Sequence, residues 1–241
     1  MVFHILKGVT NMSRETLISM NAPTKNIKTP RKSFLFMKRT LDIVFSLLLF
    51  VLLLPLGLVI AVISAIDTKA SPLFLQTRIG KNGKEFRCLK FRTMSIDAPA
   101  NVATCDLEAQ KYISPTGRTL RRFSLDELPQ LWNILIGDMS FVGPRPVIPA
   151  EKELLRLREL HYATTVRPGL TGWAQINGRD NLRVNKKAFM DGYYARHATF
   201  LFDMQILTKT VMCVLRSTDV VDGHAVQEAD IRILLNHRTA S

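Results

Sequence analysis

The chain has 241 residues, 47% of them hydrophobic, which suffices for one core of ordinary size and leaves little room for a second full domain. Its 33 Lys and Arg residues against 20 Asp and Glu give a formal charge of +13, so its partners are expected to be anionic: nucleic acid, nucleotide phosphates or acidic lipid headgroups. Three widely separated cysteines show no metal-ligand spacing, and their odd number favours a reducing compartment over a disulfide framework.

The two ends of the chain are interpreted as appendages. Residues 1–36 mix single apolar residues with polar and basic ones without a sustained period, which predicts a mobile, basic N-terminal arm. No cleavable signal sequence can be made of this arm. Residues 221–241 are polar and are interpreted as a C-terminal tail.

An uncharged apolar segment follows the arm. From Ile43 to Ile66 no residue is charged, and at 1.5 Å per residue such a helix would be about 36 Å long, enough to cross a bilayer core. Apolar residues surround it on every face, which disfavours a core helix of a soluble domain. Pro55 lies in its middle, where a proline removes a helical hydrogen bond and bends the helix.

The flanking charges favour one of two membrane arrangements. Basic residues lie on both sides of the segment, at Arg31, Lys32, Lys38, Arg39, Lys69, Arg78, Lys81 and Lys84. Because positive residues stay cytoplasmic, the two ends compete for one side, and a helix that enters, breaks and returns resolves this conflict. We therefore predict a re-entrant membrane helix over residues 37–70, with a bent single-pass anchor as the alternative.

A β-hairpin is predicted next. Residues 73–79 and 85–94 form its strands, and Asn82-Gly83 is the best two-residue turn between them. On the second strand Lys90 and Arg92 share one face at period two. These cations either bind a diphosphate or protect a solvated edge strand from pairing with other strands. The residues alone favour the second interpretation.

Two adjacent carboxylates, Asp126 and Glu127, lie in the segment SLDELPQ at residues 124–130, and the apolar run that follows at 131–135 is interpreted as a buried helix. Pro129 fits a first helical turn, which places Asp126 at or beside the N-cap, after three arginines at 118, 121 and 122. One interpretation is a nucleophile with a metal partner. The other is a capping box of Ser124 and Glu127, in which both side chains only satisfy backbone donors; the heptapeptide alone favours capping.

The segments around this motif are less distinctive. Residues 95–117 are turn-rich and are predicted to form a surface excursion that can close over a site. Arg145 lies between Pro144 and Pro146, and a guanidinium on so stiff a backbone suits bidentate phosphate binding, although a rigid connector would look the same.

The last third of the chain contains a glycine-rich loop between predicted helices. Residues 167–179 combine three glycines with Trp173 and amides, which suits recognition of a ring and its polar edges, unless the Trp only fills the core. Helices are predicted over three ranges: 151–162, 186–195 and 200–215. The charged residues of the first range are interpreted mostly as a solvent-facing side of the helix.

Five ordered motifs resemble the bacterial sugar transferase family, the monotopic polyprenyl-phosphate phosphoglycosyl transferases. The motifs are KRTLDI at 38–43, KFRTM at 90–94, SLDELPQ at 124–130, GDMSFVGPRP at 137–146 and RPGLTGWAQINGR at 167–179. The resemblance covers residues 37–220. One departure is Leu54 before Pro55, where many members carry Ser-Pro, so a hydroxyl contact at the helix break is lost.

This resemblance implies a mainly helical α+β fold: a small cytoplasmic catalytic domain at 71–220 with a β-hairpin, and a Pro-kinked re-entrant helix at the cytoplasmic face of the bacterial inner membrane, the compact form of the family. Such enzymes pass a sugar 1-phosphate from a UDP-sugar to undecaprenyl or another polyprenyl phosphate and release UMP, which is the first membrane step of exopolysaccharide assembly. The resemblance implies membrane lipids as partners and no nucleic acid. It leaves open whether the protein forms a homodimer.

The resemblance also implies residue roles. Asp126 maps onto the family's nucleophile, which forms a covalent phosphosugar intermediate, and Glu127 is its dyad partner, with Mg²⁺ held by both. Substrate binding is expected of Lys90, Arg92, Arg145, Gln175 and Arg179.

Two other classes of protein share some of these features. A glycosyltransferase with an Asp-x-Asp metal motif is disfavoured because that motif, like a Walker A or dinucleotide glycine pattern, is missing from the sequence. The non-enzyme rival is a membrane-tethered basic protein that binds nucleic acid or anionic lipid, in which the carboxylate pair is only a cap and Asp126→Asn is tolerated. The transferred sugar and the glycan pathway stay open.

Overall fold

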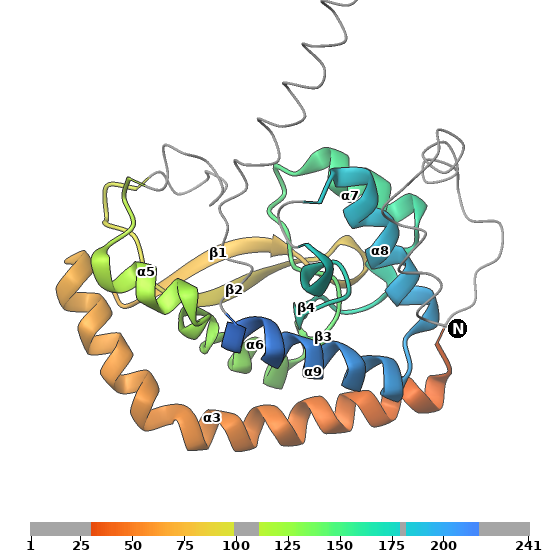
Figure 1. The fold of residues 1–241 in the computed structure, drawn as a ribbon, viewed down its shortest axis with the longest axis horizontal. Coiled ribbons are helices and arrows are strands. Elements are labelled where there is room, and N and C mark those ends of the chain that lie inside the picture. Colours follow the sequence, from red (N-terminus) through yellow and green to blue (C-terminus); the bar gives the residue numbers. More distant parts are fainter. Residues whose placement is uncertain (1–29, 99–110, 179–181, 217–241) are drawn as a thin grey trace, which may run out of the picture.

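The computed structural model describes residues 30–98, 111–178 and 182–216, and within these ranges the fold is mainly helical with two small sheets (Figure 1). The α-helices are α3 (Lys32–Thr68), α5 (Pro115–Arg122), α6 (Gln130–Ile136), α7 (Lys152–Leu160), α8 (Val184–His197) and α9 (Phe200–Arg216). The strands are β1 (Leu73–Ile79), β2 (Glu85–Phe91), β3 (Ser140–Val142) and β4 (Gly169–Thr171). Short 3₁₀ helices are η1 (Lys81–Gly83), η2 (Leu125–Glu127), η3 (Ala163–Thr165) and η4 (Gln175–Asn177). The predicted α+β class and hairpin are confirmed.

Helix α3 is a single element of 37 residues with Pro55 inside it. It runs along one side of the molecule and curves towards the domain at its C-terminal end (Figure 1), as expected for a proline that removes one intrahelical hydrogen bond. The helix begins at Lys32, earlier than the predicted boundary at residue 37. Residues 1–29 of the predicted arm, and the predicted tail at 221–241, lie outside the described residues.

The N-terminal part of α3 is fastened to the domain by buried polar contacts. The Oδ1 of Asp42 accepts hydrogen bonds from Ser140 Oγ (3.1 Å) and from the Phe141 amide (3.2 Å). Lys38 Nζ lies 2.5 Å from Asp203 Oδ2 at the start of α9. Buried hydrogen bonds to ionised groups are stronger than neutral ones, so these contacts fix the direction in which α3 leaves the domain.

Arg39 of α3 caps the C-terminal end of another helix. Arg39 donates from its two terminal nitrogens to the carbonyl oxygens of Ile134 (2.6 Å) and Leu135 (2.8 Å), in the last turn of α6. The last carbonyls of a helix have no intrahelical partner, and a cation there also complements the helix dipole. Arg39 thereby couples the long helix to the element that follows the carboxylate pair.

The C-terminal part of α3 is fastened to the same domain. Ser64 Oγ donates to the Arg92 carbonyl (2.6 Å), and the Asp67 carboxylate accepts hydrogen bonds from the amide and hydroxyl of Thr116. Both ends of the apolar helix are therefore bound to one folded unit.

Between these attachments the outer side of α3 is apolar and exposed. Nine of its large hydrophobic side chains are more than half exposed: Phe36, Val44, Leu48, Val51, Leu52, Leu58, Val59, Val62 and Ile66. By length and composition α3 can cross a membrane. Helix α6 extends this apolar surface: the sequence predicted a buried helix, but only one face is buried, and Trp132 is half exposed with its ring centroid 6.0 Å from that of Phe50.

The hairpin has the predicted first strand and the predicted connection at residues 80–84, but its second strand is shorter than the predicted range 85–94. Strands β1 and β2 pair antiparallel from Leu73↔Phe91 to Ile79↔Glu85, and β2 ends at Phe91, before Arg92. Asn82 and Gly83 both have positive φ, and the Lys84 amide donates to the Lys81 carbonyl (3.2 Å). The Asn-Gly signal thus located the turn.

The second sheet was not predicted. Strands β3 and β4 pair in parallel at Ser140↔Gly169 and Val142↔Thr171. A Cβ atom on Gly143 would lie 2.3 Å from the Arg167 carbonyl oxygen, and one on Gly172 would lie 2.1 Å from the Gly143 carbonyl oxygen. These two glycines therefore let two backbones approach closely, which is the structural reason for a glycine-rich loop here.

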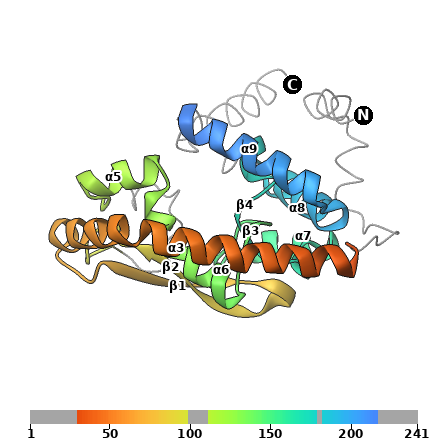
Figure 2. The ribbon, with the colours of Figure 1, turned by 90° about the horizontal axis from the view of Figure 1, so that it is seen from below.

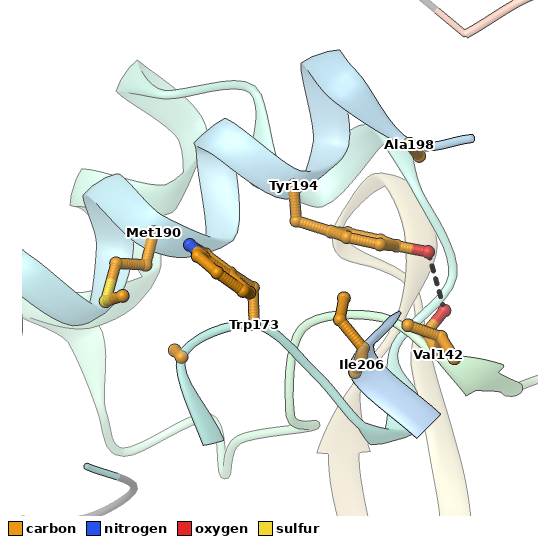
Figure 3. Packing of buried hydrophobic residues seen from close by; sticks show 7 residues of the cluster. Val142, Trp173, Met190, Tyr194, Ala198 and Ile206 are labelled. Atoms are coloured by element: carbon orange, nitrogen blue, oxygen red, sulfur yellow. Dashed lines mark hydrogen bonds between the residues drawn. The ribbon is translucent and has the colours of Figure 1, made fainter. Parts of the chain in front are cut away.

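The core beside this sheet contains Trp173. Its side chain is 7% exposed and packs with Val142, Met190, Tyr194 and Ile206 (Figure 3). Its ring meets the Phe202 ring edge to face at a centroid distance of 5.0 Å. The structure therefore supports the interpretation of Trp173 as a core residue. It contradicts the interpretation that Trp173 recognises the ring of a substrate.

Candidate active site

The two carboxylates lie in the 3₁₀ turn η2, three residues before α6 begins. Ser124 adopts a left-handed conformation (φ 54°) before this turn, and its side chain makes no capping hydrogen bond; its carbonyl instead accepts from the Glu127 amide (3.2 Å). The capping box is therefore not formed. The predicted position of Asp126 at the α6 N-cap is also wrong, because Pro129 occupies that position.

Glu127 is held by two cations from different parts of the chain. Its Oε1 accepts hydrogen bonds from Lys90 Nζ (2.8 Å) on β2 and from Arg145 Nη2 (3.1 Å) in the loop after β3. The Glu127 side chain is 8% exposed. Charge-assisted bonds of this kind orient a buried carboxylate in one position. Lys90 thus faces the carboxylate pair and does not merely protect a strand edge.

Asp126 is 7% exposed, and its titration reflects that burial. Desolvation raises the pKa of the Asp126 carboxyl above its usual range. Lys90 opposes this shift in pKa, the Glu127 charge adds to it, and Arg121 and Arg145 oppose it further. The positive charges around Asp126 therefore favour the ionised form, which is the form needed for nucleophilic attack or metal binding.

Arg145 is positioned by its backbone. Val147 bridges to Ile79 at the end of β1, and the Arg145 carbonyl accepts from Arg158 Nη1 (2.9 Å) on α7. Arg158 in turn donates from Nε (2.9 Å) and Nη2 (2.6 Å) to Asp191 Oδ2 on α8. This buried ion pair links the two helices to the loop that carries Arg145.

Arg158 and Asp191 were missed by sequence reasoning. The charges of the segment around Arg158 were interpreted as a solvent face, whereas Arg158 is 5% and Asp191 1% exposed. Burial raises the pKa of Asp191 even though the charge of Arg158 lowers it. No local pattern in the sequence marks which of several helical arginines turns inward.

Two further arginines belong to the cationic surroundings. Arg78 Nη1 donates to the Pro146 carbonyl (3.1 Å); burial lowers the pKa of Arg78, and so does the nearby charge of Arg145. Arg121 Nε donates to Thr93 Oγ1 (2.8 Å), and its pKa is lowered by burial and raised by Asp126. Arg78 was counted only as a flanking charge of the membrane segment.

The other predicted substrate-binding residues are placed differently. Arg92 is directed to the Ser71 carbonyl (2.9 Å) and stacks over the Phe74 ring (5.5 Å to the centroid), so it is engaged apart from the carboxylate pair. Gln175 lines a pocket that also reaches Glu127. Its Nε2 donates to the Leu170 carbonyl (3.0 Å), and within the described part of the chain its buried Oε1 has no hydrogen-bond partner. Arg179 lies outside the described residues.

The sequence matches a known family. The model of the family described as bacterial sugar transferase matches residues 33–217, which contain all but the first residue of the long helix, both carboxylates and all the cations above.

Individual relatives carry more specific names. The UDP-galactose-lipid carrier transferase of Erwinia amylovora is 37% identical over 75% of this chain and 41% of its own length. The UDP-glucose:undecaprenyl-phosphate glucose-1-phosphate transferase of Escherichia coli is 38% identical over 73% of this chain and 39% of its own. The exopolysaccharide production protein ExoY of Sinorhizobium fredii is 36% identical, covering 75% of this chain and 86% of its own. The chain thus spans about two fifths of several of the curated relatives that it matches and most of ExoY.

Proposed function

Because the chain belongs to the bacterial sugar transferase family, we propose that it transfers a sugar 1-phosphate from a UDP-sugar to undecaprenyl phosphate. The products are UMP and a polyprenyl diphosphosugar, which starts exopolysaccharide assembly. The observation that carries this proposal is a buried carboxylate pair, surrounded by Lys90, Arg121 and Arg145, that lies beside an exposed apolar helix. The UDP-sugar is a soluble dianion and the acceptor is a lipid phosphate. The reaction therefore needs the cationic carboxylate site and the exposed apolar helix side by side.

The reaction takes two displacements at one phosphorus. A carboxylate oxygen of Asp126 attacks the phosphorus that carries the sugar, the bond from this phosphorus to the bridging oxygen breaks, and UMP leaves with the electron pair. A phosphate oxygen of the lipid then attacks the same phosphorus, and the acyl phosphate bond breaks to return the Asp126 carboxylate. A covalent intermediate lets the soluble and the lipid substrate use the site in turn.

Lys90 and Arg145 serve the charge balance of both displacements. They hold Glu127 at 2.8 and 3.1 Å and act on Asp126 at the same time. A phosphate arriving at the pair would meet donors that are already oriented, so little reorganisation is required when charge moves to the leaving oxygen.

The donor set fits a magnesium ion. Mg²⁺ is usually bound by one or two carboxylates together with substrate phosphates and water. Asp126 and Glu127 supply such oxygens on one turn, and the described ranges contain no group of three or more His, Cys, Asp or Glu that would form a cage from protein side chains alone. Asp126 and Glu127 would hold the ion, which when bound offsets charge on the diphosphate.

The attachments of α3 support the re-entrant arrangement at the cytoplasmic face of the inner membrane. Its N-terminal part is bound through Asp42 and its C-terminal part through Ser64 and Asp67, all to one domain. A helix that crossed the bilayer would carry one end about 30 Å away from that domain. The exposed apolar side of α3 would then lie in the cytoplasmic leaflet, with the bend at Pro55 returning the chain.

The proposed function is tested by the intact mass of the purified full chain. The protein is mixed briefly with Mg²⁺ and each of a panel of UDP-sugars, without polyprenyl phosphate. We expect one donor to add the mass of its sugar phosphate to the protein and to release UMP. If no donor gives an adduct while UMP release with polyprenyl phosphate is normal, the transfer is direct. If no donor gives an adduct and no UMP is released, the enzyme proposal is overturned.

A first substitution tests the role of Lys90. Lys90→Met is expected to lower turnover at least about tenfold, because a hydrogen bond to a charged group contributes about 1.5–3 kcal/mol. Loss of this cation also raises the pKa of Asp126, so the acidic limb of the pH–rate profile should move to higher pH. Initial rates of UMP release measured across pH give both quantities.

Arg92→Met is the matched control, because Arg92 is two residues away but is bonded to Ser71 and stacked on Phe74. It should leave the pH–rate profile unchanged. Equal effects of the two substitutions would show that only the total positive charge of the strand matters.

A further inference from the structure

A pocket of about 300 Å³ lies between α3 and α9. Its lining includes Ser124 and Glu127 of the carboxylate turn, and Thr210, Cys213 and Val214 on α9. We call it the α3–α9 pocket. The two helices start close together, joined by the ion pair of Lys38 and Asp203, and α9 then diverges from α3 (Figure 2).

The walls of the α3–α9 pocket are predominantly apolar. Leucines come from α3, from the residue after η2, from α6, from β4 and from α9: Leu49, Leu53, Leu128, Leu131, Leu170 and Leu207. Besides Ser124 and Glu127, the polar residues of the lining are Thr171, Gln175 and Thr210, and the two threonine hydroxyls bond to each other. Most hydroxyl and amide groups of a nucleotide or a sugar would therefore face leucines without partners, which is costly. The walls fit a hydrocarbon chain.

Glu127 is the charged residue of this lining, and its surroundings indicate which kind of chain fits. It is hydrogen-bonded to Lys90 and Arg145, two cations that do not line the pocket themselves. A ligand that matches both the apolar walls and these nearby cations carries a phosphate at the head of a hydrocarbon tail. The volume is at the lower end of the range for small-molecule sites, so it holds the first part of a long tail and not the whole.

The pocket is continuous with the apolar surface of the protein. Leu48, Val51 and Leu52, which are neighbours of the wall residues Leu49 and Leu53 on α3, are more than half exposed. The remainder of a long tail can thus continue along α3 into the bilayer without crossing a polar surface.

From these features we infer that the α3–α9 pocket binds the phosphate-proximal isoprene units of the lipid acceptor, with α9 as one wall. This inference rests on the proposed function. It assigns to α9 a part in acceptor binding, and it separates the acceptor tail from the donor, whose nucleoside and sugar must be bound elsewhere around the carboxylate pair.

The test blocks the pocket and measures the two half-reactions separately. Val214→Trp enlarges a side chain that lines the pocket. Val211→Trp is the matched control, since Val211 is on the same helix but does not line the pocket and is 58% exposed. With Val214→Trp we expect adduct formation from the UDP-sugar to stay within about twofold and discharge of the adduct to undecaprenyl phosphate to fall about tenfold or more, whereas Val211→Trp should leave both steps unchanged. Equal loss in both steps, or no loss in either, overturns the inference.

A second measurement does not depend on activity. The full chain in nanodiscs of phosphatidylethanolamine and phosphatidylglycerol is photolabelled with a benzophenone-bearing isoprenyl phosphate, and the labelled peptides are mapped. Labelling of residues 207–214 and 49–53 that undecaprenyl phosphate competes away supports the inference. Labelling elsewhere, or labelling by a benzophenone phospholipid that undecaprenyl phosphate does not displace, overturns it. If the parent forms no adduct and releases no UMP, the proposed function fails, and this mapping still decides the pocket.

Discussion

Replacing Asp126 with asparagine is expected to lower turnover by at least about 10³-fold, the scale of loss when a catalytic nucleophile is removed. Asparagine has almost the same shape and would preserve the turn η2, but its amide cannot form the acyl phosphate. The measurement is UMP release from a UDP-sugar in the presence of polyprenyl phosphate, with the intact mass of the variant recorded beside it. No sugar-phosphate adduct should form.

The stability of Asp126→Asn provides the control. Burial raises the pKa of Asp126 in the folded state, so between the unfolded and the folded pKa the folded state binds more protons than the unfolded state. Stability therefore falls as pH rises through this window, and the loss is complete above the folded pKa. Asparagine removes this loss, so the free energy of unfolding at neutral pH should be unchanged or higher.

The combination of lost activity and retained stability discriminates between the two interpretations of the carboxylate pair. A structural cap would tolerate asparagine in both measurements. Activity within about tenfold of the parent would contradict a nucleophilic Asp126 and would favour direct displacement by the lipid phosphate.

The hairpin and the helices other than α5 followed from local sequence because their signals are local. Helix α5 (Pro115–Arg122) was not predicted, and its first residues belong to the range that was expected to be a surface excursion. The apolar run around Pro55 predicted α3, and Asn82-Gly83 predicted the position of the turn. The pairing of β3 with β4 could not be predicted in this way. These strands have three residues each and are joined across a helix, and the glycines that allow them to approach resemble those of any flexible loop.

The site was predictable in part for the same reason. Asp126 and Glu127 form a motif, but the turn that holds them is 3₁₀ and its cap is not formed, because tertiary contacts with Lys90 and Arg145 determine where Glu127 points. Lys90 and Arg92 looked equivalent at period two. Only the strand's end at Phe91 separates them, and strand ends are set by partners that the local sequence does not contain.

The second large effect concerns Arg158, which holds the carbonyl of Arg145 and the carboxylate of Asp191. Arg158→Leu should destabilise the fold by about 3–5 kcal/mol, because it leaves the Asp191 carboxylate, 1% exposed, without its counter-charge. Chemical denaturation of the full chain in detergent, monitored by circular dichroism, measures this loss. Arg156→Leu is the matched control, since Arg156 pairs with Glu153 on the exposed side of the same helix and such pairs contribute little.

The double variant Arg158→Leu with Asp191→Leu separates stability from positioning. Replacing both members of a buried ion pair by apolar residues is often neutral or stabilising, so most of the lost unfolding free energy should return. Activity should not return with it, because Arg145 would still lack the donor that holds its carbonyl and its guanidinium would no longer be fixed on Glu127. A fully active double variant would show that Arg158 only stabilises the fold. A stable double variant with reduced kcat would show that the pair, although it touches neither carboxylate of the site, positions Arg145 for the transfer.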